Sequence, residues 1–397
     1  MSGTQRKPGR LGPYVNGYRA RLLELGHTPR GVIHRLTYLG HLGRWMASEG
    51  VDVRQLDSAA VDACIAARRA EYRDVPARGS LLALLDYLRS EGVVPPEPRG
   101  QLTPLDELIA DYRQWLTVRR ALAPATVHRY LKLARRFLAQ RRSAGDELGV
   151  KNLTGADVTA FLLCECARLK LKSAEAHAGE LRSLLRFLHL RGFTALALAD
   201  CVPSVASWRD AGIPKVLPRP DVERLLQSCD RSSLSGARDL AVLMLLARLG
   251  LRSVEVSRLE LEDLRWRVGE IVVDGKGHRR DRLPLPSDVG EALVGYLSLR
   301  DRRTRRVFLT LSAPIRPIEP TTVSLVVRRA CARAGLPQIS AHRLRHALAS
   351  DLLREGASLI DIGQVLRHRD LASTAIYAKV DLVRLREVAQ PWPGVER

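Results

Sequence analysis

The stretch "SAHRLRHALASDLLREGASLIDIGQVLRHRDLASTAIYAKV", Ser340–Val380, places histidines, arginines and one tyrosine at spacings that helix packing alone does not require. Within "HRLRH", His342 and Arg345 are three residues apart, so on a helix both side chains face the same way and can reach one anion. His368 and the lone Tyr377 follow in the second half. No group of carboxylates with metal-binding spacing accompanies them, which favours chemistry on a phosphate held by arginines in place of Mg²⁺.

The charge of the chain indicates its partner. Its 397 residues carry a formal net charge of +21, and the isoelectric point is about 10.5. The basic residues are spread along the whole chain, whereas a basic membrane-binding segment concentrates them on one helix or tail. Nucleic acid is therefore the expected partner. No apolar run reaches the roughly 18 residues that span a bilayer, and no secretory leader is recognisable, so a cytoplasmic, nucleoid-associated protein with no membrane partner is expected.

The cysteines give no indication of a metal site. Of the six, only Cys164 and Cys166 are close in sequence, and a C-x-C pair without a second pair is poor zinc-binding spacing. We expect free, buried thiols, no bound metal and no cofactor.

Two proline-rich breaks divide the chain. "VVPPEP" (93–98) and the segment 202–220, with its four prolines, cannot form helices, because proline lacks the amide donor and restricts the residue before it. They predict units at 1–95, 101–203 and 212–397. The first two units resemble one another, most clearly in "GSLLALLDYLRSEG" (79–92) and "GELRSLLRFLHLRG" (179–192). We predict an internal duplication of a small helical domain, although shared helical periodicity is an alternative explanation.

A helix predicted over 124–142 has two distinct faces. One face is an apolar stripe with steps of three and four residues. The other face is cationic, and either contacts DNA phosphates or is simply solvated. Its members are His128, Arg129, Lys132, Arg135 and Arg136.

The third unit has a different pattern. Residues 237–250 read as a buried helix that ends at Gly250, a residue suited to the left-handed position after a helix. Residues 269–286 alternate apolar and polar side chains around a glycine-rich turn, which predicts a β-hairpin. Ser358–Asp361, "SLID", is a capping box that predicts the start of another helix.

On these residues the third unit resembles the catalytic domain of the tyrosine recombinases, the phage-integrase family of site-specific DNA recombinases. "LGLRSVEVSRLELEDL" (249–264) resembles the arginine box of the family, and "GKGHRRDRLPLP" its hairpin lysine segment. "HRLRH" resembles the H-x-x-R-H box, and "LRHRDLASTAIYAKV" the final box with its tyrosine. The boxes occur in order over roughly 215–385, and together they are far more specific than any one of them alone.

The resemblance implies a mainly α-helical fold with a small antiparallel β-sheet in the catalytic domain. Two N-terminal helical domains would precede this α+β domain, which would occupy 212–397. The domain at 101–203 would correspond to the core-binding (SAM-like) domain of the family. The domain at 1–95 would be a second DNA-binding or interaction module.

The resemblance also implies a catalytic role for each matched residue. Tyr377 would attack a scissile phosphodiester to give a 3′-phosphotyrosine, and later reversal onto another 5′ hydroxyl would rejoin strands without ATP. A phenol with a pKa near 10 is only about 0.1% ionised at pH 7, so the attack needs a base and a cationic pocket. The expected base is His342 and the expected acid Lys276; Arg252 and Arg345 would hold the phosphate, His368 would add a hydrogen bond, and Glu255 and His346 would orient these groups. Arg279 and Arg280 are the alternatives to Lys276 and further candidates for DNA contact.

The expected partners are double-stranded DNA at specific sites and further copies of this chain, as a tetramer on DNA, with accessory or sibling recombinases as additional partners. Residues 381–390 could pack on a neighbouring subunit or fold back on their own domain. Three positions depart from the family pattern: Arg367 replaces a glycine, Ala347 a threonine or serine, and Lys379 a histidine.

Two other functions remain open at this point. One is a type IB topoisomerase-like enzyme that nicks and reseals one strand as a monomer. The other is a DNA-binding architectural protein without catalysis, against which the complete set of catalytic residues argues. Integration, excision and transposition of a mobile element are all compatible with the sequence.

Overall fold

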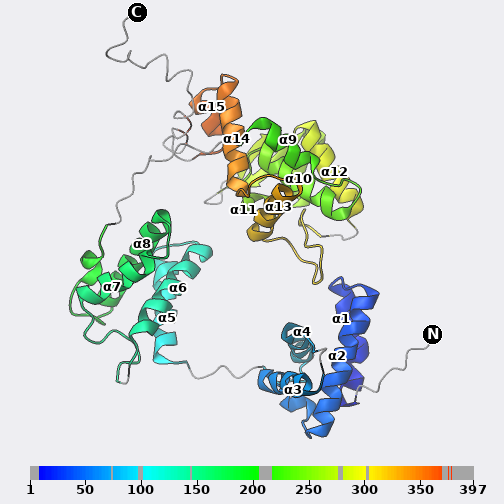
Figure 1. The fold of residues 1–397 in the computed structure, drawn as a ribbon, viewed down its shortest axis with the longest axis vertical. Helices are drawn as coiled ribbons and strands as arrows, with labels where there is room; N and C mark the ends of the chain where they lie inside the picture. The colour runs from blue at the N-terminus through cyan, green and yellow to red at the C-terminus, as the bar shows by residue number, and fades with distance from the viewer. Residues whose placement is uncertain are drawn as a thin grey trace, which may run out of the picture. The chain divides into compact units, whose positions relative to one another are not determined.

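The computed structural model describes residues 9–72, 75–96, 102–143, 145–204, 217–275, 280–300 and 304–368, together with Thr374 and Tyr377 (Figure 1). These residues are mostly helical and include one three-stranded antiparallel sheet, which confirms the predicted fold class. By its contacts the chain divides into two compact units, Glu97–Ala211 and the combination of Met1–Pro96 with Gly212–Arg397. Buried side chains gather into cores that each lie within one predicted range, and the domain boundaries themselves remain a prediction.

The first helical region packs short helices around an apolar core. Thr28 caps the helix Pro29–Ser48: its hydroxyl accepts a hydrogen bond from the Gly31 amide at 3.2 Å, and Pro29 occupies the first helical position. Tyr18 and Leu42 are among its fully buried side chains. The elements are η1 (Gly9–Tyr14), α1 (Val15–Glu24), α2 (Pro29–Ser48), η2 (Val53–Gln55), α3 (Ser58–Glu71) and α4 (Arg78–Ser90).

The second helical region has helix starts that its sequence specifies. Capping boxes at Thr103 and Thr154 begin two helices, since each threonine exchanges hydrogen bonds with an aspartate three residues later. Aromatic contacts fill its core, for example Phe137 with Phe161 at 4.9 Å between ring centroids. The elements are α5 (Pro104–Gln114), the π-helical η3 (Trp115–Arg119), α6 (Pro124–Arg141), α7 (Gly155–Cys166), α8 (Leu171–Leu190) and η4 (Leu198–Cys201).

The two regions share an order of elements. In each, the described residues contain four α-helices, and the second helix packs on the fourth: α2 on α4, and α6 on α8. A different order would have contradicted the predicted duplication. The duplication itself stays a prediction.

The third region surrounds one buried helix, α10 (Leu234–Arg248), in which every residue from Gly236 to Ala247 is buried. Gly236 is needed there, because a Cβ at this position would lie 1.9 Å from the carbonyl oxygen of Asp230. In the sequence, α10 is preceded by α9 (Arg219–Gln227). It is followed by α11 (Ser253–Arg258), α12 (Ser287–Leu299), α13 (Pro320–Arg333), α14 (Ala341–Arg354) and α15 (Leu359–Val365). The predicted capping box is confirmed, since Ser358 caps α15 together with Asp361.

The sheet of this region is small and antiparallel. Its strands β1 (Leu264–Arg265), β2 (Glu270–Asp274) and β3 (Arg280–Pro284) lie in chain order, with Ile271 opposite both Leu264 and Leu283. The short helices η5 (Leu261–Asp263) and η6 (Trp266–Val268) flank β1. Strands β2 and β3 form the predicted hairpin, and residues 276–279 between them lie outside the described part of the chain.

All six cysteines are free thiols, but the expectation that they are buried is wrong for Cys164 and Cys201, which are exposed, and for Cys166, which is only half-buried. Cys64, Cys229 and Cys331 are buried.

No helix in the described part of the chain has the length and apolar character needed to cross a bilayer.

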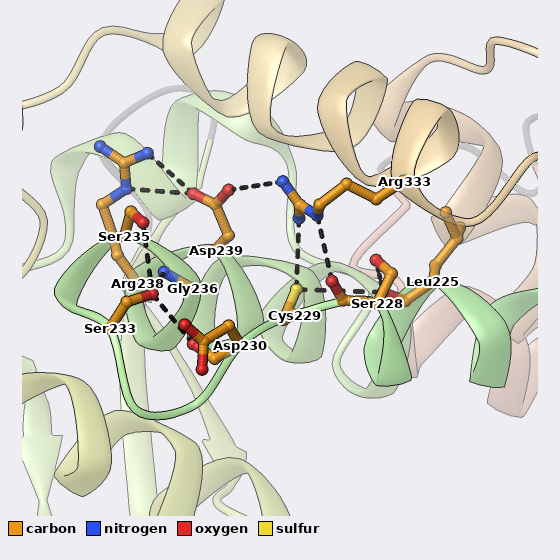
Figure 2. A network of polar contacts seen from close by, with 10 residues as sticks. All are labelled: Leu225, Ser228, Cys229, Asp230, Ser233, Ser235, Gly236, Arg238, Asp239 and Arg333. Carbon is orange, nitrogen blue, oxygen red and sulfur yellow. Dashed lines mark hydrogen bonds and ion pairs between the residues drawn. The ribbon is translucent and has the colours of Figure 1, made fainter.

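A buried polar network joins α10 to α13 and to the end of α9 (Figure 2). Asp239 is only 4% exposed, and its carboxylate accepts hydrogen bonds from Arg238 at 2.8 Å and from Arg333 at 3.4 Å. Arg333 also donates to the Ser228 carbonyl at 3.1 Å and to the Cys229 sulfur at 3.4 Å. One carboxylate thus balances two guanidinium groups at the junction of three helices.

This network predicts a large cost for Asp239→Asn. The substitution keeps the size of the side chain but leaves Arg238, which is 3% exposed, without a counter-charge. We expect the free energy of unfolding of this region to fall by about 3–5 kcal/mol. Scanning calorimetry of the full chain measures the loss. The control is Glu262→Gln, which breaks the exposed pair with Arg305 and should cost less than about 1 kcal/mol. Equal losses in the two variants would contradict the prediction.

Candidate active site

Three elements and the segment after them supply the candidate residues. Arg252 stands at the N-cap of α11, while His342, Arg345 and His346 lie on α14. His368 follows the end of α15, and the described residues Thr374 and Tyr377 come after it. The predicted acid Lys276, together with Arg279, Lys379 and residues 381–390, lies outside the described residues.

Arg345 is almost completely buried, at 1% exposed. Its guanidinium donates to the carbonyl oxygen of Gly250 at 2.5 Å and to that of Leu366. Burial, followed by the charges of Arg252 and Arg367, lowers the pKa of Arg345 to about 10, so it remains cationic at neutral pH. Arg345 therefore connects the end of α10 with the end of α15 and keeps a positive charge between them.

Gly250 makes this arrangement possible. Its φ of +58° confirms the left-handed conformation predicted from the sequence. A Cβ there would lie 2.8 Å from a methyl group of Leu366 and 3.1 Å from one of Leu348. Any larger residue at this position would be strained by the positive φ and would force these leucine side chains to shift.

Arg252 is held by Glu255. The carboxylate of Glu255 accepts from the Arg252 guanidinium at 2.6 Å and from its backbone amide at 2.8 Å. Glu255 is 1% exposed, whereas the side chain of Arg252 is 37% exposed. The carboxylate is thus enclosed, and the guanidinium that it orients stays accessible to an anion.

Tyr377 is 1% exposed and lies against the histidines of α14. Its hydroxyl is 2.8 Å from Nδ1 of His346. The His346 ring is in turn 4.3 Å from the His342 ring, centroid to centroid, and packs edge-on against it. Burial raises the pKa of Tyr377 to about 12, opposed by the charge of Arg345. The phenol is therefore protonated, and its hydroxyl is hydrogen-bonded directly to the imidazole of His346.

His368 also lies beside the tyrosine. Its ring is stacked parallel to that of Tyr377 with 6.4 Å between centroids, and its Nδ1 is 2.7 Å from the Thr374 hydroxyl. Because Thr374 occupies Nδ1, the Nε2 atom is left for another partner.

The three imidazoles are held neutral. Burial, followed by neighbouring positive charges, lowers the pKa of His346 and of His368 to about 4. The His342 residue is exposed, but partial loss of hydration, followed by the charges of Arg345 and Arg252, also lowers the pKa of its ring. Within the described residues, no group of three or more His, Cys, Asp or Glu side chains is placed to hold a metal ion.

The structure brings together most of the residues selected from the sequence. Arg252, Glu255, His342, Arg345, His346, His368 and Tyr377 form one cluster. Two members were missed: Thr374, and Arg367, whose guanidinium binds Glu255 at 2.7 Å. Arg367 was recognisable only as a departure from the family's glycine, and nothing in the sequence distinguishes Thr374.

The cationic face of α6 is partly neutralised by its own domain. Arg129 and Arg136 form ion pairs with the buried carboxylates of Glu180 and Glu165, and Arg135 pairs with Asp106 at 2.9 Å. The two other members of the predicted face, His128 and Lys132, are exposed and have no ion pair with a described residue. Arg280 of β3 pairs with Asp263 at 2.7 Å and with Asp274 at 3.4 Å.

Comparison with known proteins gives consistent matches. The family model described as "Phage integrase family" matches residues 215–383. "Putative integrase/recombinase y4rA" of Sinorhizobium fredii is 39% identical over 395 residues, which cover 97% of this chain and 95% of that protein. "Tyrosine recombinase XerD" of Listeria monocytogenes is 31% identical over 291 residues, 72% of this chain and 97% of that protein.

The fold also matches a solved structure. The XerH site-specific recombinase bound to a palindromic difH substrate, in a post-cleavage complex, superposes with a TM-score of 0.56 at 20% identity. The match covers 74% of this chain and 98% of that one.

The half-buried histidines His346 and His368 predict a pH dependence of stability. In the unfolded chain His346 and His368 take up protons as the pH falls through 6.5, whereas in the folded protein they do so only near pH 4. The unfolded state therefore binds more protons between these values, and stability falls as the pH falls through this window. We expect His346→Asn to flatten the dependence measured by thermal unfolding at a series of pH values. Tyr377→Phe, which keeps both imidazoles, is the control, and an unchanged slope in His346→Asn would contradict the assignment.

Proposed function

Because the chain belongs to the phage integrase family of tyrosine recombinases, we propose that it cleaves and rejoins DNA strands at specific sites with Tyr377 as the nucleophile. The observation that carries this assignment is the 2.8 Å contact between the Tyr377 hydroxyl and His346, beside the guanidinium groups of Arg252 and Arg345. A buried tyrosine in a core needs no such surroundings. A phosphodiester attacked by a phenol needs a proton acceptor and fixed positive charge.

In the first step the Tyr377 oxygen forms a bond to the scissile phosphorus, and the bond from phosphorus to the 5′ oxygen breaks. The phenol loses a proton and the departing 5′ oxygen gains one, so the step is balanced without a metal or a nucleotide. The 3′-phosphotyrosine keeps the free energy of the broken ester. Attack by a 5′ hydroxyl from another strand then reverses the step and joins new partners.

Arg252 and Arg345 are proposed to hold the non-bridging oxygens. Arg252 presents an accessible guanidinium whose orientation Glu255 fixes. Arg345 uses two of its nitrogens on backbone carbonyls, and its Nε has no hydrogen-bond partner among the described residues. Both charges are in place before the substrate arrives, so little reorganisation is needed as negative charge builds up in the transition state.

The proton of Tyr377 has an acceptor in contact. His342 was the base expected from the resemblance, with His346 in a supporting role. We infer that His346 receives the proton, because its Nδ1 is in contact with the hydroxyl and burial keeps its ring neutral. The hydroxyl donates to Nδ1 when the proton of the neutral ring is on Nε2. The ring of His342 packs against that of His346.

His368 is proposed to donate from Nε2 to the phosphate. In the tautomer with the ring proton on Nε2, Nδ1 accepts from the Thr374 hydroxyl at 2.7 Å and Nε2 is the donor that the phosphate requires. Lys276, the expected general acid, would protonate the 5′ oxygen from the loop between β2 and β3; that loop lies outside the described residues.

We further propose that the second helical region and the catalytic region both bind the DNA duplex, and that the protein acts as a tetramer of identical chains on two DNA sites. The net charge of +21 supports the DNA partner. The first helical region would extend the footprint or contact another subunit, and the protein would act in the bacterial cytoplasm on nucleoid DNA. Movement of a mobile element, by integration, excision or transposition, is the reaction outcome that we favour.

Covalent capture tests the proposed nucleophile. We expect the wild-type protein to form an SDS-stable adduct with members of a pool of nicked duplexes whose arms are randomised, and Tyr377→Phe to form none. Arg252→Ala should slow adduct formation by roughly 10²–10³-fold, because it removes one fixed charge from the phosphate. Absence of any wild-type adduct would leave a binding protein without catalysis. Relaxation of supercoiled plasmid by a strict monomer, without products that join two sites, would instead favour a type IB topoisomerase-like enzyme.

Salt dependence of binding tests the face of α6. Lys132 is exposed and has no ion pair with a described residue, so Lys132→Ala should weaken binding to a mixed-sequence duplex and reduce the slope of log K against log salt by about 1. The thermal stability of the Lys132→Ala variant should stay unchanged. Arg129→Ala is the informative comparison: it should destabilise the second helical region, because Glu180, which is 1% exposed, loses its partner. An unaltered salt slope in Lys132→Ala would argue that this face does not contact phosphates.

A further inference from the structure

Arg367 adopts a backbone conformation that suits glycine. It directly follows the last turn of α15, with φ at +54°. Its amide bonds to the Gln364 carbonyl at 2.9 Å, and the next amide, of His368, bonds to the Gly363 carbonyl at 2.9 Å. These two hydrogen bonds form the Schellman motif, whose left-handed position is usually a glycine. A side chain kept in this conformation needs a compensating interaction.

The compensating interaction is with Glu255. The Arg367 side chain is 6% exposed and donates from Nη2 to Glu255 Oε2 at 2.7 Å. The same carboxylate holds the backbone amide and the guanidinium of Arg252. Arg252 closes a ring of contacts, since its Nη2 lies 3.4 Å from the Arg367 carbonyl oxygen. The ring connects the start of α11 with the turn that carries His368.

This ring is not neutral. With Arg345 alongside, three guanidinium groups surround one carboxylate, and the Asp281 carboxylate of β3 acts on Arg367 from a greater distance. Nε and Nη1 of Arg367 are buried and have no hydrogen-bond partner among the described residues. Burial without full compensation is unfavourable for a cation, so folding stability alone does not explain this arrangement. An arriving phosphate would supply the missing negative charge.

We propose that Arg367 is a positioning residue for the cleavage reaction: it shares Glu255 with Arg252 and thereby sets how the Arg252 guanidinium faces the scissile phosphate. This inference rests on the proposed function. When Arg367 is absent, Glu255 has one cation instead of two and binds Arg252 with its whole charge. The positive charge available to the phosphate falls, and the His368 turn loses its connection to α11.

The proposal predicts that glycine, the residue best suited to the backbone here, impairs the enzyme. In Arg367→Gly the single-turnover rate of adduct formation at saturating protein should fall by roughly 10- to 100-fold, since small displacements of a catalytic group have effects of this size. Affinity for the same duplex, measured by fluorescence anisotropy, should change by less than about threefold, because one ion pair removed from a broad electrostatic interface has little weight. The duplex is one selected by wild-type adduct formation from the randomised pool.

Two further substitutions separate the effect of the Arg367 charge from the effect of its backbone conformation. Arg367→Met keeps a long side chain and the strained φ but removes the charge, so its rate should fall as far as that of Arg367→Gly. Arg367→Lys keeps the charge and should recover part of the rate. Thermal unfolding of each variant is measured in parallel. Rates that follow the melting temperatures through the series, rather than the charge at position 367, would overturn the proposal.

A double-mutant cycle tests whether Arg367 acts through Glu255. Glu255→Gln and Arg367→Gly should each slow adduct formation, and the double variant should be no slower than the slower single variant. Rate losses that multiply in the double variant, or a wild-type rate in Arg367→Gly, would overturn the proposal while wild-type adducts still support the nucleophile. Absence of wild-type adducts would overturn both the proposed function and this inference.

Discussion

The guanidinium of Arg345 is almost completely enclosed, and two segments far apart in the sequence supply its hydrogen-bond acceptors. The carbonyl oxygens of Gly250 and Leu366 bind it from the ends of α10 and α15. Burying a cation costs less when its donors find acceptors, so the position of α14 depends on both helix ends. The same contacts bring Arg252, which follows Gly250, and His368, which follows Leu366, to the same location. The requirement to satisfy one buried cation therefore also assembles the site.

Much of this arrangement is predictable from the sequence because it depends on local rules. The shared face of His342 and Arg345 follows from helical spacing, the turn at Gly250 from its freedom at positive φ, and the start of α15 from the Ser358 capping box. The β-hairpin follows from alternation around a glycine-rich turn. Each of these features involves residues within a few positions of one another.

The features that were missed depend on tertiary contacts. Arg367 meets Glu255 across 112 positions of the chain, and no local pattern encodes that pairing. The cationic residues of α6 are exposed, as predicted. Two of its arginines, however, pair with Glu165 of α7 and Glu180 of α8, and sequence periodicity would not assign these carboxylates to the interior of the domain. Net charge thus indicates the class of partner, while the pairing within the fold decides which cations remain to meet it.

The burial of Tyr377 bears on how cleavage of the wrong DNA sites is avoided. A strongly cationic chain spends most of its time on DNA that is not its target, because phosphate attraction does not depend on sequence. A tyrosine that is 1% exposed, with its pKa raised to about 12, is shielded from the phosphates that pass over the surface. In the proposed reaction, selection of the correct site would then operate twice: once when the duplex binds, and again when the phenol becomes exposed to the scissile phosphate. A poorly matched duplex that binds tightly can still leave uncut.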